Sequence, residues 1–212
     1  MSNDHKPLPE HTKIDYDECC ALLILKELFP KEYSTLVIAD KPDLQGNDVG
    51  IEVTIAGNKK HLEAFNICVK ANNSDNLEKK HYYIERLKQL GIKYTDGFQV
   101  WPGVKPSYEY VKKAVESKVK KLNSGGYKHF DRYELFIFTD TWMTESIITE
   151  AMSHFCNASV FDSYKKIFVL EKGYKLHVFT DTGCQIIEID ISEQSERNIR
   201  ARRIVESAEM GN

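Results

Sequence analysis

The stretch Lys41-Pro-Asp-Leu-Gln-Gly-Asn-Asp-Val-Gly-Ile-Glu-Val-Thr54 holds the residues from which the fold can be predicted. Asp43 directly follows a proline, and Glu52 lies inside the apolar run from Val49 to Ile55. That β-branched run predicts a strand, and the Gly46-Asn47 pair before it predicts a hairpin turn. A carboxylate in an apolar strand is costly to bury without a partner. Two such carboxylates can hold a divalent metal ion against a phosphodiester.

Helices and strands alternate along the rest of the chain in a pattern typical of an α/β fold. The spacing of apolar residues, the capping residues and the turn residues predict these elements. They are helices over 15–29, 59–71, 74–90, 107–122 and 145–155, a helical tail from 192, and strands over 33–39, 51–55, 97–101, 134–139, 166–170, 174–179 and 185–189. This order predicts a mixed central β-sheet flanked by helices.

The order helix, three strands, helix, strand resembles the core of the PD-(D/E)XK nuclease superfamily. The residues that carry the resemblance are Pro42-Asp43, Glu52 in the following strand, and Glu18 in the preceding helix. Members of this group include many restriction endonucleases and DNA-repair nucleases. The resemblance covers roughly residues 15–140 and implies a restriction-endonuclease-like core. With a C-terminal β-meander and helix over about 144–207, we expect a single domain spanning 1–212.

The resemblance also implies roles for individual residues. Asp43 and Glu52 would be ligands of Mg²⁺ or Mn²⁺, with the backbone carbonyl of Val53 as a third ligand, and Glu18 would support the metal ion or its water. The alternative for Asp43 and Glu52 is a hairpin with solvated acids, and Asp48 is better explained as a turn residue. Glu18 is also compatible with a simple charge at a helix N-terminus, where the helix dipole favours an acid.

The sequence departs from the family pattern at one position. The family has a lysine two residues after the glutamate, and Thr54 occupies that position here. Thr54 can hydrogen-bond a water molecule but carries no charge. Lys59, Lys60 and Lys70 are the nearest lysines that follow in the sequence, and Lys60 is the predicted replacement in the catalytic set. The alternative is that all three are exposed helix lysines.

Basic and aromatic residues are concentrated between 108 and 133. The helix lysines from Lys112 to Lys121 and the pair Lys128-His129 could follow a phosphate backbone, and interleaved aromatic residues could stack on bases. The alternative is a solvated lysine face with core aromatic residues. A further cluster of arginines, at 197–203, fits an exposed terminal helix equally well.

Composition limits the remaining possibilities. The net charge of −3 excludes a chain that is basic throughout but permits a basic groove. The five cysteines form no CxxC pair, so reduced thiols are expected. No run of about 18 apolar residues and no secretory leader are found, which predicts a cytoplasmic protein without membrane contact. Phosphate-binding glycine loops and serine-nucleophile motifs are also missing from the sequence.

The predicted function is a Mg²⁺-dependent nuclease that hydrolyses DNA phosphodiester bonds in restriction, repair or phage defence. One alternative is a catalytically silent protein of the same fold that serves binding or assembly. The other is an unrelated α/β interaction protein. The residues do not distinguish DNA from RNA, although the resemblance favours DNA. A homodimer or a partner protein is compatible with each of these functions.

Overall fold

A computed structural model describes residues 8, 11–72, 74–95, 98–100 and 107–211. By their contacts the residues form two compact units. Unit 1 comprises Met1–Glu10 and Gly57–Lys105, and unit 2 comprises His11–Ala56 and Pro106–Asn212. Unit 1 therefore interrupts unit 2 in the sequence, between a strand and a helix that both belong to unit 2.

Unit 2 is built on a mixed seven-stranded sheet with the order β1-β2-β3-β6-β7-β8-β9. Its strands are β1 (Val37–Ile38), β2 (Leu44–Gln45), β3 (Val49–Ala56), β6 (Arg132–Thr139), β7 (Lys166–Glu171), β8 (Lys175–Thr180) and β9 (Gly183–Glu188). The β3–β6 and β6–β7 pairs are parallel, and the other neighbours are antiparallel. The mixed central sheet predicted from the sequence is therefore confirmed.

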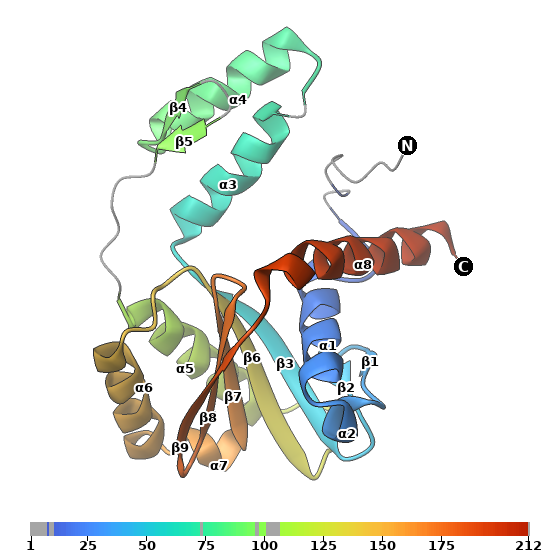
Figure 1. Cartoon of the computed structure of the whole chain (residues 1–212), viewed down its shortest axis with the longest axis vertical. Helices are drawn as coiled ribbons and strands as arrows, with labels where there is room; N and C mark the ends of the chain where they lie inside the picture. Colours follow the sequence, from blue (N-terminus) through green and yellow to red (C-terminus); the bar gives the residue numbers. More distant parts are fainter. Residues whose placement is uncertain (1–7, 9–10, 73, 96–97, 101–106, 212) are drawn as a thin grey trace. The chain divides into compact units, whose positions relative to one another are not determined.

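Helices cover both faces of this sheet (Figure 1). They are α1 (Tyr16–Leu28), α2 (Pro30–Tyr33), α5 (Glu109–Asn123), α6 (Glu145–Asn157), α7 (Val160–Ser163) and α8 (Ile191–Met210). The alternation of side chains along β6 separates two hydrophobic clusters. Phe136 packs in the cluster of α1, while Leu135 and Ile137 pack in the cluster of α5 and α6. Each face of the sheet thus has its own core.

The predicted helix from Asp15 is present, with Asp15 as its N-cap. Its side chain accepts hydrogen bonds from the backbone N–H groups of Asp17 and Glu18. The prediction around Pro30 was wrong in detail. Pro30 opens the short helix α2 instead of leading into a strand over 33–39, because a proline at the first helical position loses no hydrogen bond. The strand that follows is reduced to Val37–Ile38.

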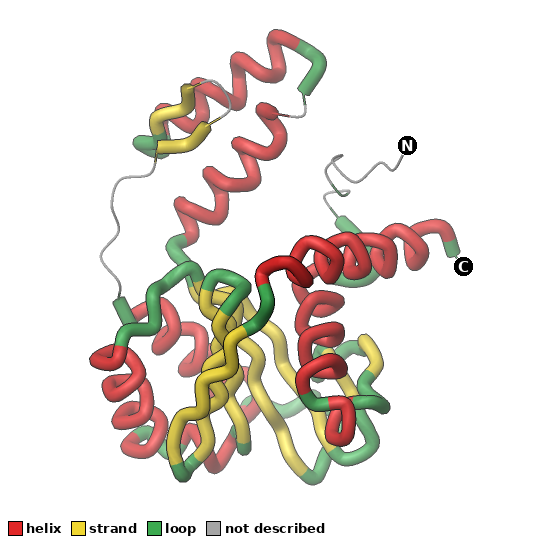
Figure 2. The backbone as a smooth tube through the Cα atoms, in the orientation of Figure 1, coloured by secondary structure: helices red, strands yellow, loops and turns green. Residues whose placement is uncertain are grey.

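Unit 1 contains two helices and a small two-stranded sheet (Figure 2). Its elements are α3 (Lys59–Asn72), α4 (Leu77–Gln89), β4 (Lys93–Thr95) and β5 (Phe98–Val100). Asn76 caps α4 by accepting a hydrogen bond from the Lys79 backbone N–H. The strand predicted over 97–101 lies partly outside the described residues.

Candidate functional site

The β2–β3 hairpin places Asp43 and Glu52 opposite each other. Leu44 pairs with Ile51 and Gln45 with Gly50, so one further step of the antiparallel register sets Asp43 against Glu52. Residues directly opposite in an antiparallel pair have side chains on the same face. Asp43 Oδ2 also accepts a hydrogen bond of 2.7 Å from the backbone N–H of Val53. The Asp43 carboxylate is therefore fixed to the edge of the strand that carries Glu52.

The side chain of Glu52 points into the interface between the sheet and α5. Its residue is 0% exposed, and in the parallel β3–β6 register it pairs with Leu135, which packs in the cluster of α5. A carboxylate buried to this degree needs a compensating charge. Lys118, on α5, supplies that charge, with its Nζ 2.6 Å from Glu52 Oε2.

Lys118 also joins the two carboxylates to each other. Its Nζ lies 3.6 Å from Asp43 Oδ2, so the two carboxylate oxygens converge on a single nitrogen atom. The Lys118 side chain is only 15% exposed, and its backbone carbonyl accepts a hydrogen bond from the hydroxyl of Tyr164. Lys121, one turn further along α5, is more exposed and lies 3.8 Å from Glu52 Oε2. The carboxylates of Asp43 and Glu52 thus converge on Lys118, on the face of the sheet that α5 covers.

Two buried polar atoms at this point have no hydrogen-bond partner among the residues that the structure describes. They are Glu52 Oε1 and the hydroxyl of Tyr127. Burial raises the pKa of Tyr127 far above its ordinary value, and the Glu52 carboxylate raises it further through its charge and through hydrogen bonding with the hydroxyl. The Tyr127 hydroxyl and the Glu52 carboxylate therefore lie beside each other without a well-aligned hydrogen bond, and a polar ligand at this position would satisfy both.

Glu18, in the first turn of α1, belongs to the same electrostatic cluster. Its pKa is raised to about 8, chiefly by burial and then by the charges of Asp43 and Asp15, while Lys118 opposes the shift. The pKa of Asp43 is also raised, mainly by burial, with a contribution from Glu52 and an opposing effect of the Val53 hydrogen bond. The charge of Asp43 thus acts on Glu18, and the charge of Glu52 acts on Asp43.

The loop between α5 and β6 closes over the turn that contains Asp43. The backbone N–H of Lys128 donates a 3.2 Å hydrogen bond to the carbonyl of Lys41, next to the cis Lys41–Pro42 peptide. Lys128 Nζ lies 3.4 Å from Gln45 Oε1, and Lys121 Nζ is 5.8 Å from the ring centre of Tyr127. Lys118 and Lys121 therefore lie beside the carboxylates, and Lys128 lies beside Gln45 in the neighbouring strand β2.

An open pocket of about 630 Å³ adjoins this loop. Tyr127 belongs to both the pocket wall and the surroundings of Glu52, whereas Asp43, Glu52 and Lys118 are not among the residues that line the pocket. The other lining residues are Val119, Leu122, Asn123, Gly125, Gly126, Tyr133, Ala158, Ser159, Asp162 and Ser163.

The lysine that lies beside both carboxylates is not one of the three that the sequence interpretation considered. Lys60 is an exposed residue of α3 in unit 1, whereas Lys118 contacts both carboxylates within unit 2. Our sequence interpretation treated Lys118 only as part of a basic stripe. The signal that could have identified it is its spacing from Val111 and Val115, which are both buried and place it on the inward face of α5.

A metal ion with mainly oxygen ligands fits this arrangement. Among the described residues no group of three or more His, Cys, Asp or Glu side chains could hold a metal ion. Mg²⁺, however, is commonly bound by one or two carboxylates with water and substrate oxygens. Asp43 and Glu52 supply two carboxylates. The N–H and the carbonyl of a strand residue point toward the same neighbouring strand. Since the Val53 N–H donates to Asp43, the Val53 carbonyl faces the same edge of β3 as Asp43 does.

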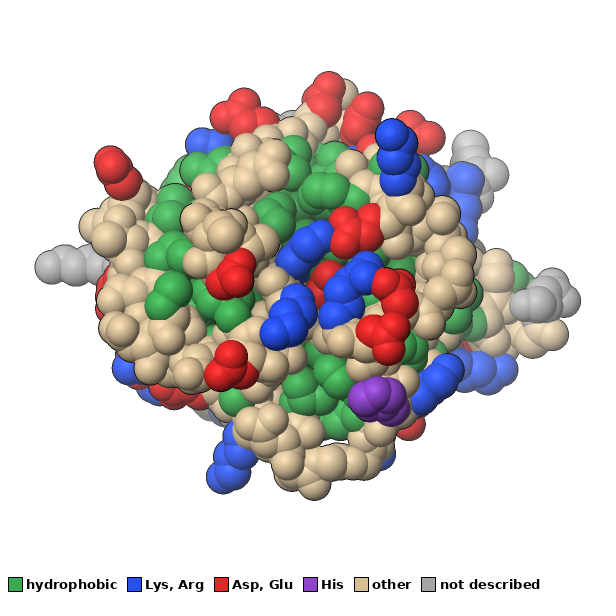
Figure 3. Space-filling model, turned by 90° about the horizontal axis from the view of Figure 1, so that it is seen from below, with side chains coloured by type: hydrophobic (Ala, Val, Ile, Leu, Met, Phe, Trp, Pro, Cys, Tyr) green, Lys and Arg blue, Asp and Glu red, His purple; other side chains and the backbone are tan. Residues whose placement is uncertain are grey.

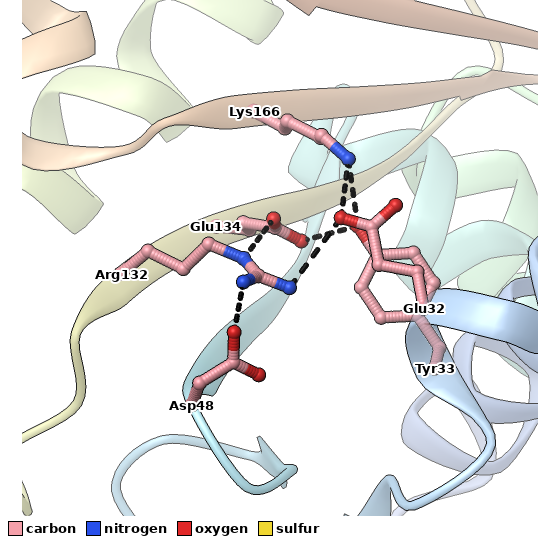
Figure 4. A network of polar contacts seen from close by, with 6 residues as sticks. All are labelled: Glu32, Tyr33, Asp48, Arg132, Glu134 and Lys166. Atoms are coloured by element: carbon pink, nitrogen blue, oxygen red, sulfur yellow. Dashed lines mark hydrogen bonds and ion pairs between the residues drawn. The ribbon is translucent and has the colours of Figure 1, made fainter.

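Asp48, predicted as a turn residue, takes part in a separate network (Figure 4). It pairs with Arg132, whose Nε lies 3.1 Å from Glu134 Oε1, and the hydroxyl of Tyr33 donates a 2.7 Å hydrogen bond to Glu134 Oε2. Glu32 joins the network by bonding Lys166 at 2.6 Å and Arg132 at 3.4 Å.

The network lies on the face of the sheet opposite to Glu52, because Glu134 and Leu135 are consecutive residues of one strand. Basic and acidic side chains also lie close together among hydrophobic ones in the view from below (Figure 3). Since acids and bases pair with each other throughout the network, its arrangement is typical of a structural ion-pair network and differs from that of the candidate site.

Comparisons of the chain with family models, with curated proteins and with solved structures give no match. Across the described part of the chain, none of the helices combines the length and the apolar character that crossing a membrane requires.

Proposed function

We propose that this protein is a divalent-metal-dependent nuclease of the PD-(D/E)XK kind that hydrolyses phosphodiester bonds of DNA. The observation that carries the proposal is the fully buried Glu52, which shares Lys118 with Asp43 and has an unsatisfied oxygen. A structural ion pair gains nothing from leaving one buried oxygen without a partner. A ligand site for a cation explains both the convergence of the carboxylates and the unsatisfied atom.

In this proposal Asp43, Glu52 and the Val53 carbonyl hold Mg²⁺ or Mn²⁺. The bound ion would supply a nucleophilic water near neutral pH and neutralise charge on the phosphate. Glu18 is suited to accept or release a proton beside the site, since its pKa of about 8 lies near the working pH. Burial is the main reason that the pKa values of Glu18 and Asp43 are raised, and the neighbouring carboxylates raise them further, a contribution that a bound cation would offset.

Lys118 takes the role that the family lysine has in the resembling nucleases. Its charge is already held beside both carboxylates, and its stem is buried along α5. When a cation is held by Asp43 and Glu52, the ammonium group of Lys118 is free to bind an oxygen of the scissile phosphate. Lys121 and Lys128 extend the positive charge around the site, where they can contact neighbouring phosphates.

A catalytically silent protein of the same fold is the second candidate. Thr54 at the lysine position and the 2.6 Å contact between Lys118 and Glu52 favour it, since a buried ion pair alone can be structural. In that case the same surface would bind a nucleic acid or a partner protein without hydrolysis.

The test is cleavage of plasmid and oligonucleotide DNA with Mg²⁺, with Mn²⁺ and with a chelator. We expect Glu52→Gln and Lys118→Met each to reduce the rate by a hundredfold or more, which corresponds to roughly 3 kcal/mol of transition-state stabilisation. Methionine retains most of the lysine stem. Lys113→Met, on the same helix but with a side chain 69% exposed, is the matched control and should cleave like wild type.

The outcomes separate the candidates. If Lys118→Met cleaves as fast as Lys113→Met while Glu52→Gln is inactive, the assignment of Lys118 is overturned and the metal site stands. If wild type does not cleave, calorimetric titration with Mn²⁺ decides between the remaining possibilities. Binding that is lost in Glu52→Gln supports a metal site without hydrolysis, and absence of binding in wild type contradicts the metal site.

A further inference from the structure

Positive charge is concentrated in residues 57–105, the longer of the two segments of unit 1. Residues 57–105 contain nine Lys or Arg and five Asp or Glu, a net charge of +4, whereas the rest of the chain carries −7. The whole chain has a net charge of −3, so the distribution is strongly asymmetric. A basic segment within an acidic chain is the electrostatic pattern expected of a surface that contacts phosphates.

Helix α4 presents this charge together with an exposed aromatic ring. Lys79, Tyr82 and Arg86 follow one another at spacings of three and four residues, so they lie along one face of the helix. Lys79 and Arg86 are exposed, and Tyr82 is 65% exposed, with its ring 5.6 Å from that of Tyr83. Leu87, which lies about 100° around α4 from Arg86, packs with Ala64 and Cys68 of α3. The exposed face is therefore not needed for the core of unit 1.

Among the described residues, Arg86 is held by Glu63 at 2.9 Å and by Gln89 at 3.1 Å. These contacts fix the guanidinium on the surface of the helix. No contact is found for the Lys79 ammonium group within the described part of the chain, so its charge is available to a partner. A large exposed aromatic side chain between two cations is suited to stack on a base while the cations bind the adjacent phosphates.

We infer that the Lys79–Tyr82–Arg86 face of α4 binds a single-stranded segment of the nucleic acid. The inference rests on the proposed function for the identity of the substrate. A base that stacks on Tyr82 must be unpaired, which is why single-stranded DNA fits this face better than an intact duplex. Unit 1 is inserted between β3, which carries Glu52, and α5, which carries Lys118.

The experiment measures binding of fluorescein-labelled oligodeoxythymidine by anisotropy over a series of NaCl concentrations, in a Glu52→Gln background so that no strand is cut. Lys79→Glu should weaken binding about tenfold and lower the slope of log Kd against log salt by about 0.7 or more, as expected for one lost phosphate contact to a single strand. Tyr82→Ala should weaken binding about fivefold or more with an unchanged slope, because stacking releases no counterions. Lys31→Glu, an exposed lysine of α2, serves as control and should bind like the parent.

The inference is overturned if Lys79→Glu and Tyr82→Ala both bind like the Lys31→Glu control. It is also overturned if a blunt duplex binds as tightly as the single strand and Tyr82→Ala has no effect. Hydrolysis of bis(p-nitrophenyl) phosphate, which has one phosphodiester and no polynucleotide strand for α4 to hold, separates this result from the proposed function. The α4 variants made in the otherwise wild-type chain should hydrolyse this compound at the wild-type rate. If the wild type fails to hydrolyse it, that result counts against the nuclease and leaves the binding result unaffected.

Discussion

At the scale of single residues, Glu52 is unusual because it is ionisable, fully buried and only partly satisfied. One oxygen is paired with Lys118 and the other has no described partner. By contrast, Glu134 on the neighbouring strand is equally buried, yet both of its oxygens have a hydrogen-bond partner. Two buried glutamates in one sheet thus differ in whether both of their carboxylate oxygens have a partner. This difference is the residue-level reason for assigning a ligand to one of them only.

A prediction at this scale concerns the titration of Glu18. Its pKa is raised to about 8 by burial and by neighbouring acids, from an ordinary value of 4.5. The folded state therefore binds a proton that the unfolded state has already released, and this contribution to stability is present below about pH 4.5 and lost as the pH rises through about 8. The free energy of unfolding should fall over this interval in wild type and fall less in Glu18→Gln, as measured by denaturant titration.

Carbon-13 NMR of the Glu18 carboxyl group gives a direct check. We expect a titration midpoint near 8 in the free protein. Added Mg²⁺ should lower the midpoint, because a nearby cation favours the carboxylate form. A midpoint near the ordinary value of 4.5, unchanged by Mg²⁺, would remove Glu18 from the site.

At the scale of elements, the β2–β3 hairpin and α5 together create the candidate site. The hairpin aligns Asp43 with Glu52, and α5 brings Lys118 across the sheet face to both. Gly50 allows this arrangement, because a Cβ atom at this position would lie 2.4 Å from Pro42 Cγ and 2.8 Å from Phe130 Cδ2. The turn before Asp43 and the loop before β6 can both approach β3 only because this residue has no side chain.

We therefore predict that Gly50→Ala destabilises the protein by about 1–3 kcal/mol, the usual cost of overpacking a core. Thermal or denaturant unfolding measures the loss. Because Pro42 must move away from the new methyl group, the variant should also bind Mn²⁺ more weakly. Gly46→Ala, in the same hairpin, is the comparison, since its closest contact would be 3.1 Å to a Val49 side-chain carbon. An equal loss in both variants would show that the approach of Pro42 does not depend on Gly50.

At the scale of the whole molecule, the two units differ in the size of the hydrophobic clusters that their described residues form. The described core of unit 1 consists of Ala64, Cys68, Leu87 and Ile92, with a few partly buried neighbours. Unit 2 has a large cluster on each face of its sheet. Since burial of apolar surface is the main stabilising contribution, unit 1 is expected to be the less stable of the two.

Hydrogen–deuterium exchange should show this difference. We predict that backbone amides of α3 and α4 exchange earlier than those of β6 and α6, through local opening of unit 1 while unit 2 stays folded. Mass spectrometry of peptic peptides resolves the two sets. Exchange of all four elements at one common rate would instead indicate a single cooperative unit. Oligodeoxythymidine should slow exchange in α4 if this helix binds the strand as inferred.

Much of the fold could be predicted from local sequence patterns. The Asp15 cap, the β-branched strands and the final meander depend on residues that are close in the sequence, and the structure contains them. The alignment of Asp43 with Glu52 could be anticipated for the same reason, because a hairpin register follows from its turn. The start of α2 at Pro30 was missed, since proline both ends one helix and favours the first turn of the next.

The sequence by itself thus determined the class of fold, the hairpin and the pair of carboxylates, because hydrophobic periodicity, capping and turn formation act over a few residues. Only the tertiary structure decided which lysine lies beside these carboxylates. Lys118 lies 66 residues from Glu52, and its approach depends on how α5 packs against the sheet. The pairing of Asp48 with Arg132 and the separation of unit 1 were decided in the same way. Contacts between distant segments follow from the burial of whole faces, which no short stretch of sequence specifies.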